Sequence, residues 1–180
     1  MKQIILLIAV VIALCSCTPQ PAGETEEQDA TAKLNIELVK KMFISIEEED
    51  IETLKEILDT SFTEIGPGID DELTYAETIE GNIYFYEAWD SIKFNLQYIM
   101  HETVQDDVKE DWVLSWSLAS MYNIELEKSF KIRYHNASRI EDGKIVYTIV
   151  YWDRLDLFEQ MGAELDWGDD DDDDDEEHDD

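Results

Sequence analysis

The chain has 180 residues and a formal net charge of −32. Such an acidic chain repels phosphate backbones and offers no cationic footprint, which excludes nucleic-acid binding as its function. Hydrophobic residues make up 44% of the chain, with 5 Trp, 8 Tyr and 6 Phe, and this predicts a globular middle. The two cysteines, Cys15 and Cys17, lie near the N-terminus. The predicted folded part therefore has no disulfide, thiol nucleophile or Cys-based zinc site.

The first 16 residues have the pattern of a secretory signal peptide. Lys2 precedes the apolar run 4–14, which is shorter than the roughly 20 apolar residues that span a bilayer. The run ends in Leu14-Cys15-Ser16-Cys17, which resembles the bacterial lipobox. The resemblance implies cleavage after residue 16 and acyl chains such as palmitate on Cys17. Cys15 fits less well because the bulky Leu14 precedes it, and an ordinary cleaved signal peptide is the alternative.

A lipidated Cys17 makes the membrane a partner of this protein. Each buried CH₂ group contributes about 0.8 kcal/mol, and the two or more chains on such a cysteine anchor a protein stably. The resemblance implies a lipid-anchored location in the bacterial cell envelope. Thr18 stands where an Asp would retain a lipoprotein in the inner membrane, so the outer membrane is favoured.

Two segments flank the predicted domain, which spans residues 32–166. Residues 17–31 form a flexible tether after the lipidated cysteine, because they include two of the three prolines and no large apolar side chain. Residues 167–180 form an acidic tail that cannot bury apolar area and is predicted to be disordered. Its aspartates could hold Ca²⁺ loosely, but the EF-hand pattern is missing and a solvated polyanion is favoured.

The first half of the domain is predicted to be mainly helical. Leu34, Leu38, Met42 and Ile46 recur every four residues, which predicts a helix over 32–46. Asp50 is placed to cap a second helix. This second helix is predicted over 51–58. It is followed by an extended piece over 62–65, which ends at Gly66-Pro67-Gly68, and by a helix over 75–92.

The second half alternates with the period of β-strands. The predicted strands cover 93–100, 112–122, 130–136 and 144–152, and a polar turn over 105–111 separates the first two. Asp142-Gly143 between two alternating runs predicts a tight hairpin. A short helix over 154–161 is expected to close the domain and to end at Gly162.

Helices followed by strands predict an α+β domain with N-terminal helices packed in an antiparallel sheet. The strand over 144–152 is apolar on both of its faces, unlike a strand of a sheet with one solvated face. One face should cover the helices, and the other is predicted to pack on a second copy, making a homodimer, or on another protein.

Three stretches resemble the nuclear transport factor 2-like superfamily and its SnoaL-like group. They are Val39-Lys40-Lys41-Met42-Phe43 through Leu54, Ile83-Tyr84-Phe85-Tyr86-Glu87-Ala88-Trp89, and Tyr151-Trp152-Asp153-Arg154 through Gly162. The resemblance covers about residues 33–163. It implies a curved antiparallel sheet wrapped round N-terminal helices, a cystatin-like cone with a pocket.

Enzymes of this family carry acidic or His residues in the cone, where a drier environment suits a carboxyl group to acid–base work. Asp153 ends a predicted buried strand and is a catalytic candidate, but an N-cap of the helix over 154–161 is the favoured role. His135 could act as a base if it faces the pocket. A place on a polar sheet face is the favoured alternative.

Tyr84, Trp112 and Trp116 are candidates for lining an apolar pocket. Packing in the core explains aromatic residues at these spacings equally well. The histidines lack zinc-ligand spacing, and no phosphate-binding loop or nucleophile elbow is present. The sequence therefore predicts no metal and no cofactor.

These observations favour a membrane-anchored lipoprotein whose domain binds a small apolar ligand or a protein, without a specific activity. The alternative is a SnoaL-like enzyme that performs isomerase, cyclase or hydrolase chemistry on a small apolar molecule. Asp153 or His135 would then carry the proton. The two hypotheses differ in whether the cone is filled with side chains or hollow.

Overall fold

The computed structural model describes residues 22–105 and 109–164. The elements follow the predicted order of helices first and strands after them. They are α2 (Ala22–Glu47), α3 (Ile51–Ile57), β1 (Leu58–Ile65), β2 (Glu72–Thr74), α4 (Tyr75–Ala88), β3 (Trp89–Gln105), β4 (Lys109–Asn123), β5 (Lys128–Glu141), β6 (Lys144–Trp152) and α5 (Arg154–Met161).

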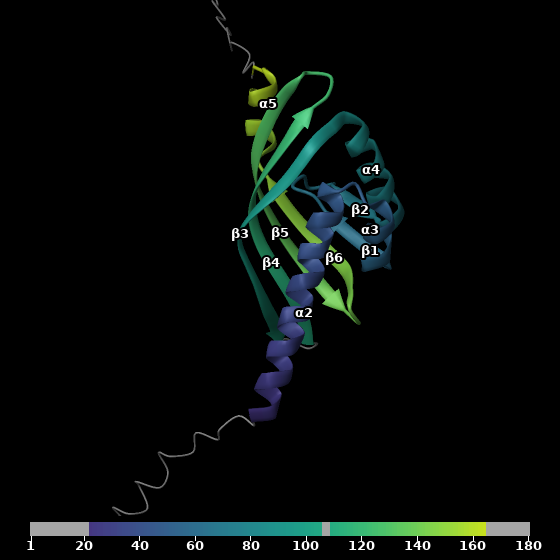
Figure 1. The fold of residues 1–180 in the computed structure, drawn as a ribbon, viewed down its shortest axis with the longest axis vertical. Helices are drawn as coiled ribbons and strands as arrows, with labels where there is room; N and C mark the ends of the chain where they lie inside the picture. The colour runs from purple at the N-terminus through teal and green to yellow at the C-terminus, as the bar shows by residue number, and fades with distance from the viewer. Residues whose placement is uncertain (1–21, 106–108, 165–180) are drawn as a thin grey trace, which may run out of the picture.

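The strands form one curved six-stranded sheet in the order β2-β1-β6-β5-β4-β3. Helices α2, α3 and α4 lie on the same side of this sheet, and α5 lies at one end of it (Figure 1). The predicted fold class, helices packed against a curved sheet, is confirmed. The antiparallel expectation needs one amendment, because β1 pairs with β6 in the parallel direction.

The hairpin between β5 and β6 has the predicted turn. Asp142 and Gly143 have positive φ angles of 49° and 73°, as the mirror-image two-residue turn requires. Glu141 and Lys144 pair directly across it. The predicted closing helix is also confirmed: α5 ends at Gly162, whose φ of 93° is left-handed.

Several element boundaries differ from the prediction. The polar turn predicted over 105–111 is wrong, because β3 and β4 continue their antiparallel pairing as far as Gln105 and Lys109. Helix α2 begins at Ala22, inside the segment predicted to be a flexible tether; the Glu, Gln and Ala residues there have high helix propensity. Helix α4 ends at Ala88, because Trp89 is extended and starts β3. Strand β1 begins at Leu58, where the chain leaves the helical conformation at the end of α3.

The inner face of the sheet carries two hydrophobic clusters along its strands. One, the solid half, joins α2, α3 and β1 to the sheet and includes Val39, Phe43, Leu54, Val113 and Ile145. The other, the hollow half, includes Ile92, Ala119, Met121, Phe130, Ile132 and Leu157, with aromatic residues of α4 and β6 against it. The two halves share one sheet but differ in how completely they are filled.

Candidate functional site

A cavity of about 440 Å³ lies in the hollow half of the cone. This volume is on the scale of small-molecule sites. Residues from α2, α4, the sheet and α5 line it: Ile46, Glu64, Leu73, Thr78, Gly81, Asn82, Phe85, Trp89, Phe94, Ala119, Met121, Ile132, Tyr134, Val150, Trp152 and Leu157. The lining is therefore mostly apolar and aromatic, with a few polar groups.

Small residues on two facing elements help to keep this space open. Ala119 lies on the inner face of β4, where it is 1% exposed, and its methyl group reaches little beyond the sheet. Gly81 lies on α4, and a Cβ atom added there would meet no heavy atom within 4 Å. Leu157 of α5 contributes a further apolar wall.

Glu64 is the only carboxylate among the residues that line the cavity in the described structure. It lies on β1, beside Leu73 of β2 and Thr148 of β6. Part of the side chain is accessible through the cavity, but burial raises the pKa of the Glu64 carboxyl to about 7. Desolvation disfavours the charged form of an acid. A carboxyl with this pKa can both accept and donate a proton near neutral pH.

Tyr134 lies close enough to Glu64 for their charges to interact. Burial raises the pKa of the Tyr134 hydroxyl, the nearby Glu64 raises it further, and the Asn136 side chain partly opposes the shift. The Tyr134 hydroxyl is therefore a neutral hydrogen-bond donor at ordinary pH. Its ring packs against Phe94, with the ring centroids 5.5 Å apart.

Thr78 and Asn82 add polar residues to the α4 side of the cavity. Thr78 is 5% exposed, and its Oγ1 atom makes no hydrogen bond among the described residues. That oxygen is buried behind the cavity surface. Asn82 donates from Nδ2 to the Thr78 carbonyl oxygen over 2.8 Å.

The cavity continues into an outer pocket of about 350 Å³. Glu64, Leu73, Val150 and Trp152 line both spaces. The outer pocket adds Asp70 and Asp71 from the segment between β1 and β2, Glu72 at the start of β2, and Arg154. Arg154 pairs with Asp71 and lies 5.5 Å from the centre of the Trp152 ring. The entrance to the cavity is thus strongly acidic.

The sequence matches no protein-family model, and it matches no curated protein sequence. Solved structures do match. An LEH-like epoxide hydrolase of M. tuberculosis superimposes with a TM-score of 0.58 at 15% identity, over 72% of this chain and 90% of that one. A protein described as a SnoaL-like polyketide cyclase from Jannaschia gives a TM-score of 0.60 at 13% identity, over 74% and 95%.

A third structure is a hypothetical protein of Catenulispora acidiphila with a ketosteroid isomerase-like fold, solved with trimethylamine. It gives a TM-score of 0.60 at 12% identity, over 73% of this chain and 97% of that one. The chain has the SnoaL-like fold. At these identities the likeness concerns the fold alone.

The SnoaL-like cone holds neither of the predicted catalytic candidates inside its cavity. Asp153 caps α5, and its carboxylate accepts a hydrogen bond from the Asp156 backbone N–H over 2.9 Å. The favoured interpretation of Asp153 as an N-cap therefore describes its position. Asp153 is exposed and borders a pocket on the opposite face of the sheet.

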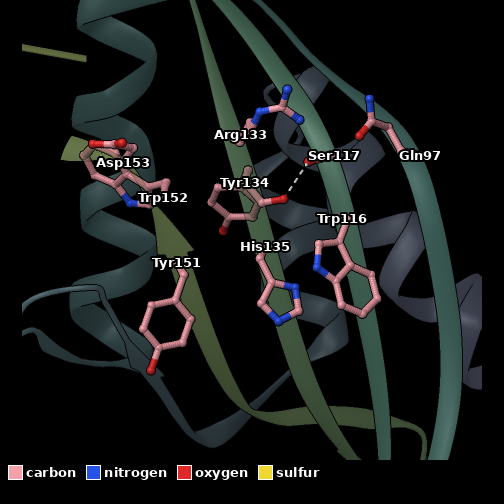
Figure 2. A pocket seen from close by; sticks show the side chains of 9 residues that line it. All are labelled: Gln97, Trp116, Ser117, Arg133, Tyr134, His135, Tyr151, Trp152 and Asp153. Atoms are coloured by element: carbon pink, nitrogen blue, oxygen red, sulfur yellow. Dashed lines mark hydrogen bonds between the residues drawn. The ribbon is translucent and has the colours of Figure 1, made fainter. Parts of the chain in front are cut away.

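His135 lies on the outer face of the SnoaL-like sheet, away from the cone. Trp116, His135 and Tyr151 form one row across β4, β5 and β6. The His135 ring stacks on Trp116 with centroids 4.6 Å apart, and Nδ1 lies 2.8 Å from the Ser115 carbonyl oxygen. Figure 2 shows these rings side by side in a pocket of about 330 Å³.

The three predicted pocket-lining aromatics lie elsewhere than in the cone cavity. Trp116 borders the pocket of about 330 Å³ on the outer face of the sheet. Trp112 packs edge-on against Tyr147, also on the outer face, at 6.1 Å between centroids. Tyr84 is 60% exposed on α4. The register explains this: Val113, Ser115 and Ala119 of β4 face inward, so the tryptophans that alternate with them face outward.

The sequence analysis did not select the polar residues of the cavity lining, namely Glu64, Thr78, Asn82 and Tyr134. A signal for Glu64 is present, because it follows Phe62 by two residues in a predicted extended piece and so shares its inward face. Over residues 22–105 and 109–164, no cluster of His, Cys, Asp and Glu has the arrangement of a metal site. In the same part of the chain, no helix is long and apolar enough to cross a membrane.

Proposed function

We propose that this protein binds a small organic molecule in the cavity of its cone. The single observation that supports this most is an apolar and aromatic cavity of about 440 Å³ with Glu64 in its wall. A filled cone would have favoured protein binding instead.

A neutral fluorescent probe, N-phenyl-1-naphthylamine, tests for a usable cavity. Ala119→Leu adds bulk on the inner face of β4 and should weaken probe binding at least tenfold. The control Ala137→Leu adds the same atoms to the outer face of β5. Ala137 pairs with Leu114 on the side of the sheet away from the cone, so this variant should bind the probe as the wild type does. Equal affinity in both variants would locate the probe outside the cone and contradict the proposal.

A second function, acid–base catalysis, is favoured by the pKa of about 7 at Glu64. The carboxylate would remove a proton from carbon or from water, and the neutral Tyr134 hydroxyl would stabilise the developing oxyanion through a hydrogen bond. The solved structures include proteins described as epoxide hydrolase and polyketide cyclase. This supports an enzyme on this fold and does not choose a substrate.

A generic proton-transfer substrate, 5-nitrobenzisoxazole, tests this second function. Its ring opens when a base removes one carbon-bound proton, so the reaction needs only a positioned carboxylate in an apolar site. We expect turnover that rises through about pH 7 and falls at least a hundredfold in Glu64→Gln. Glu87→Gln on the exposed side of α4 is the matched control. Equal turnover in both variants would exclude Glu64 as the base.

We also propose that the domain is held at the bacterial cell envelope, with the outer membrane favoured, through a lipid on Cys17. The signal-like first 16 residues support this, and they lie outside the described residues. Metabolic labelling with a palmitate analogue should mark the wild type and Cys15→Ser but not Cys17→Ser. Labelling that persists in Cys17→Ser would contradict the assignment of the anchor.

The outer sheet face is proposed to pair with a second copy of the chain. Tyr98 is 69% exposed there and Tyr151 is 55% exposed, with Trp116 between their strands. Arg133 and Glu102 lie on the same face, so that two copies related by a twofold axis could pair their charges. Sedimentation equilibrium of the full chain in density-matched detergent tests this, and Tyr98→Arg should convert a dimer to a monomer. A wild-type monomer at tens of micromolar would exclude the homodimer.

A further inference from the structure

The charges in the cone are all of one sign. Glu64 is ionisable, and no Lys, Arg or His is among the residues that line the cavity in the described part of the chain. Glu64 forms no ion pair with any residue that the structure describes, and its pKa is raised by desolvation alone. An anionic ligand would meet a carboxylate without a balancing cation, and this disfavours anions.

The aromatic rings that line the cavity together with Glu64 are suited to a positive charge. Phe85, Trp89, Phe94, Tyr134 and Trp152 line the cavity. The face of an aromatic ring carries negative charge density and attracts ammonium groups, with Trp the strongest. At this site, rings and carboxylate surround one space from several sides. Recognition of organic ammonium ions uses such combinations.

The entrance to the cavity adds to the same preference. Asp70, Asp71 and Glu72 line the outer pocket, where Arg154 is the one cationic residue among those described. Arg154 is already paired with Asp71 and stacked on Trp152. The net charge of −32 on the whole chain raises the local concentration of cations further.

The carboxylate itself disfavours a purely hydrocarbon ligand. Such a ligand would cover Glu64 in the cavity wall without giving it a hydrogen-bond partner, which costs free energy. An ammonium group would supply an opposite charge at the same position.

We infer that the natural occupant of the cone is a small organic cation, an alkyl- or arylammonium compound whose nitrogen lies against Glu64 and the surrounding aromatic rings. The inference rests on the proposed function, since it names the chemical class of the ligand for the same cavity. The apolar part of the ligand fills the remaining volume toward Met121 and Ile132. Glu64 then serves as the counterion of the ligand.

Two probes of equal shape separate charge from hydrophobicity. The cation is (4-hydroxyphenyl)trimethylammonium, and 4-tert-butylphenol is its neutral isostere, with carbon in place of the charged nitrogen. Both are titrated into the full-length chain at pH 8, with Trp89 and Trp152 fluorescence as the reporter. We expect the cation to bind at least tenfold more tightly, and this preference to fall to about onefold in Glu64→Gln. In the control Glu87→Gln, on the exposed side of α4, the preference should persist.

The outcomes separate this inference from the function on which it rests. If 4-tert-butylphenol binds as tightly as the cation in the wild type, the cavity binds ligands but the cation inference is wrong. If neither probe binds, the inference and the proposed cavity function both fail. If the cation is preferred equally in Glu64→Gln and the wild type, the preference comes from the aromatic rings or the surface field, and the assignment of Glu64 as the counterion is overturned. Circular dichroism of Glu64→Gln at pH 8 verifies that this variant is folded.

Discussion

The solid half and the hollow half of the cone are built on the same six-stranded sheet but differ in how tightly they are packed. In the solid half, α2 and α3 press Phe43 and Leu54 against Val113 and Ile145. In the hollow half, the sheet presents Ala119 and Met121 to a helix with Gly81 on its cavity side, and a space of about 440 Å³ remains. Protein interiors are normally close-packed, so an unfilled half indicates selection for something other than stability.

The polar groups of the two halves also differ. On the inner face of β5 and β6, Ser138 donates to Asn136 Oδ1 over 2.9 Å and contacts Thr148 Oγ1 at 3.0 Å. Unpartnered buried atoms occur there too, because Asn136 Nδ2 has no hydrogen-bond partner among the described residues. The hollow half is distinguished by Glu64, a carboxyl group in the cavity wall whose pKa burial raises to about 7.

The largest effect is expected from the same truncation made in each half. Leu54→Ala removes a side chain that is 2% exposed within the solid half and should destabilise the protein by about 4 kcal/mol. Leu157→Ala borders a cavity that already exists, so fewer packing contacts are lost, and we expect about 2 kcal/mol. Urea unfolding of both variants measures this. Equal losses would contradict the division into a solid and a hollow half.

A second test uses the charge in the hollow half. The folded-state pKa of Glu64 is raised from 4.5 to about 7. The free energy of unfolding of the wild type is therefore highest below pH 4.5, falls as the pH rises toward 7, and stays low above it. Glu64→Gln stays neutral and should be more stable than the wild type at pH 8, by up to about 3 kcal/mol. At pH 4 the two should unfold alike. A pH-independent difference would show that Glu64 is not desolvated.

Much of the fold could be predicted from the sequence because local patterns carry it. The period of two after residue 93, the Asp142-Gly143 turn and the Asp153 cap act over a few residues, and the structure contains all three. The parallel pairing of β1 with β6 could not be predicted in this way. It joins Glu64 to Thr148, which are distant in sequence, and alternation alone does not specify the partner of a strand.

The candidate site was harder to predict, because it depends on which face of each strand turns inward. Trp116 and His135 have the residue types expected of a pocket, yet the register of β4 and β5 places them on the outer face. Small inward residues such as Ser115 and Ala119 alternate along β4 with its large aromatic residues. Residue size alone suggested that the aromatic residues, and not the small ones, face the cone. A strand with tryptophans on one face and small residues on the other fits a cavity on the side of the small residues.

A third test compares the two buried threonines. Thr148→Val removes the partner of the Ser138 hydroxyl and leaves it less well satisfied, so we expect a loss of about 1.5 kcal/mol. Thr78→Val removes an oxygen without a protein partner, so stability should be unchanged or slightly greater. Thermal unfolding measures both. A loss at Thr78 equal to that at Thr148 would reveal a hydrogen bond from Thr78 in the free protein and contradict its unpartnered state.

The smallest effect concerns the cap of α5, which supports one wall of the cavity. Asp153→Ala removes the acceptor for the Asp156 N–H and should cost about 1 kcal/mol, whereas Asp153→Asn retains a good capping group and should cost less. Because Leu157 lies one turn along the helix and lines the cavity, fraying of α5 should also weaken probe binding in the Ala variant while the Asn variant binds normally. Loss of 5-nitrobenzisoxazole turnover in Asp153→Asn with probe affinity intact would instead assign Asp153 a role in proton transfer. Capping alone predicts that stability and binding change together, and that the charge of Asp153 matters to neither.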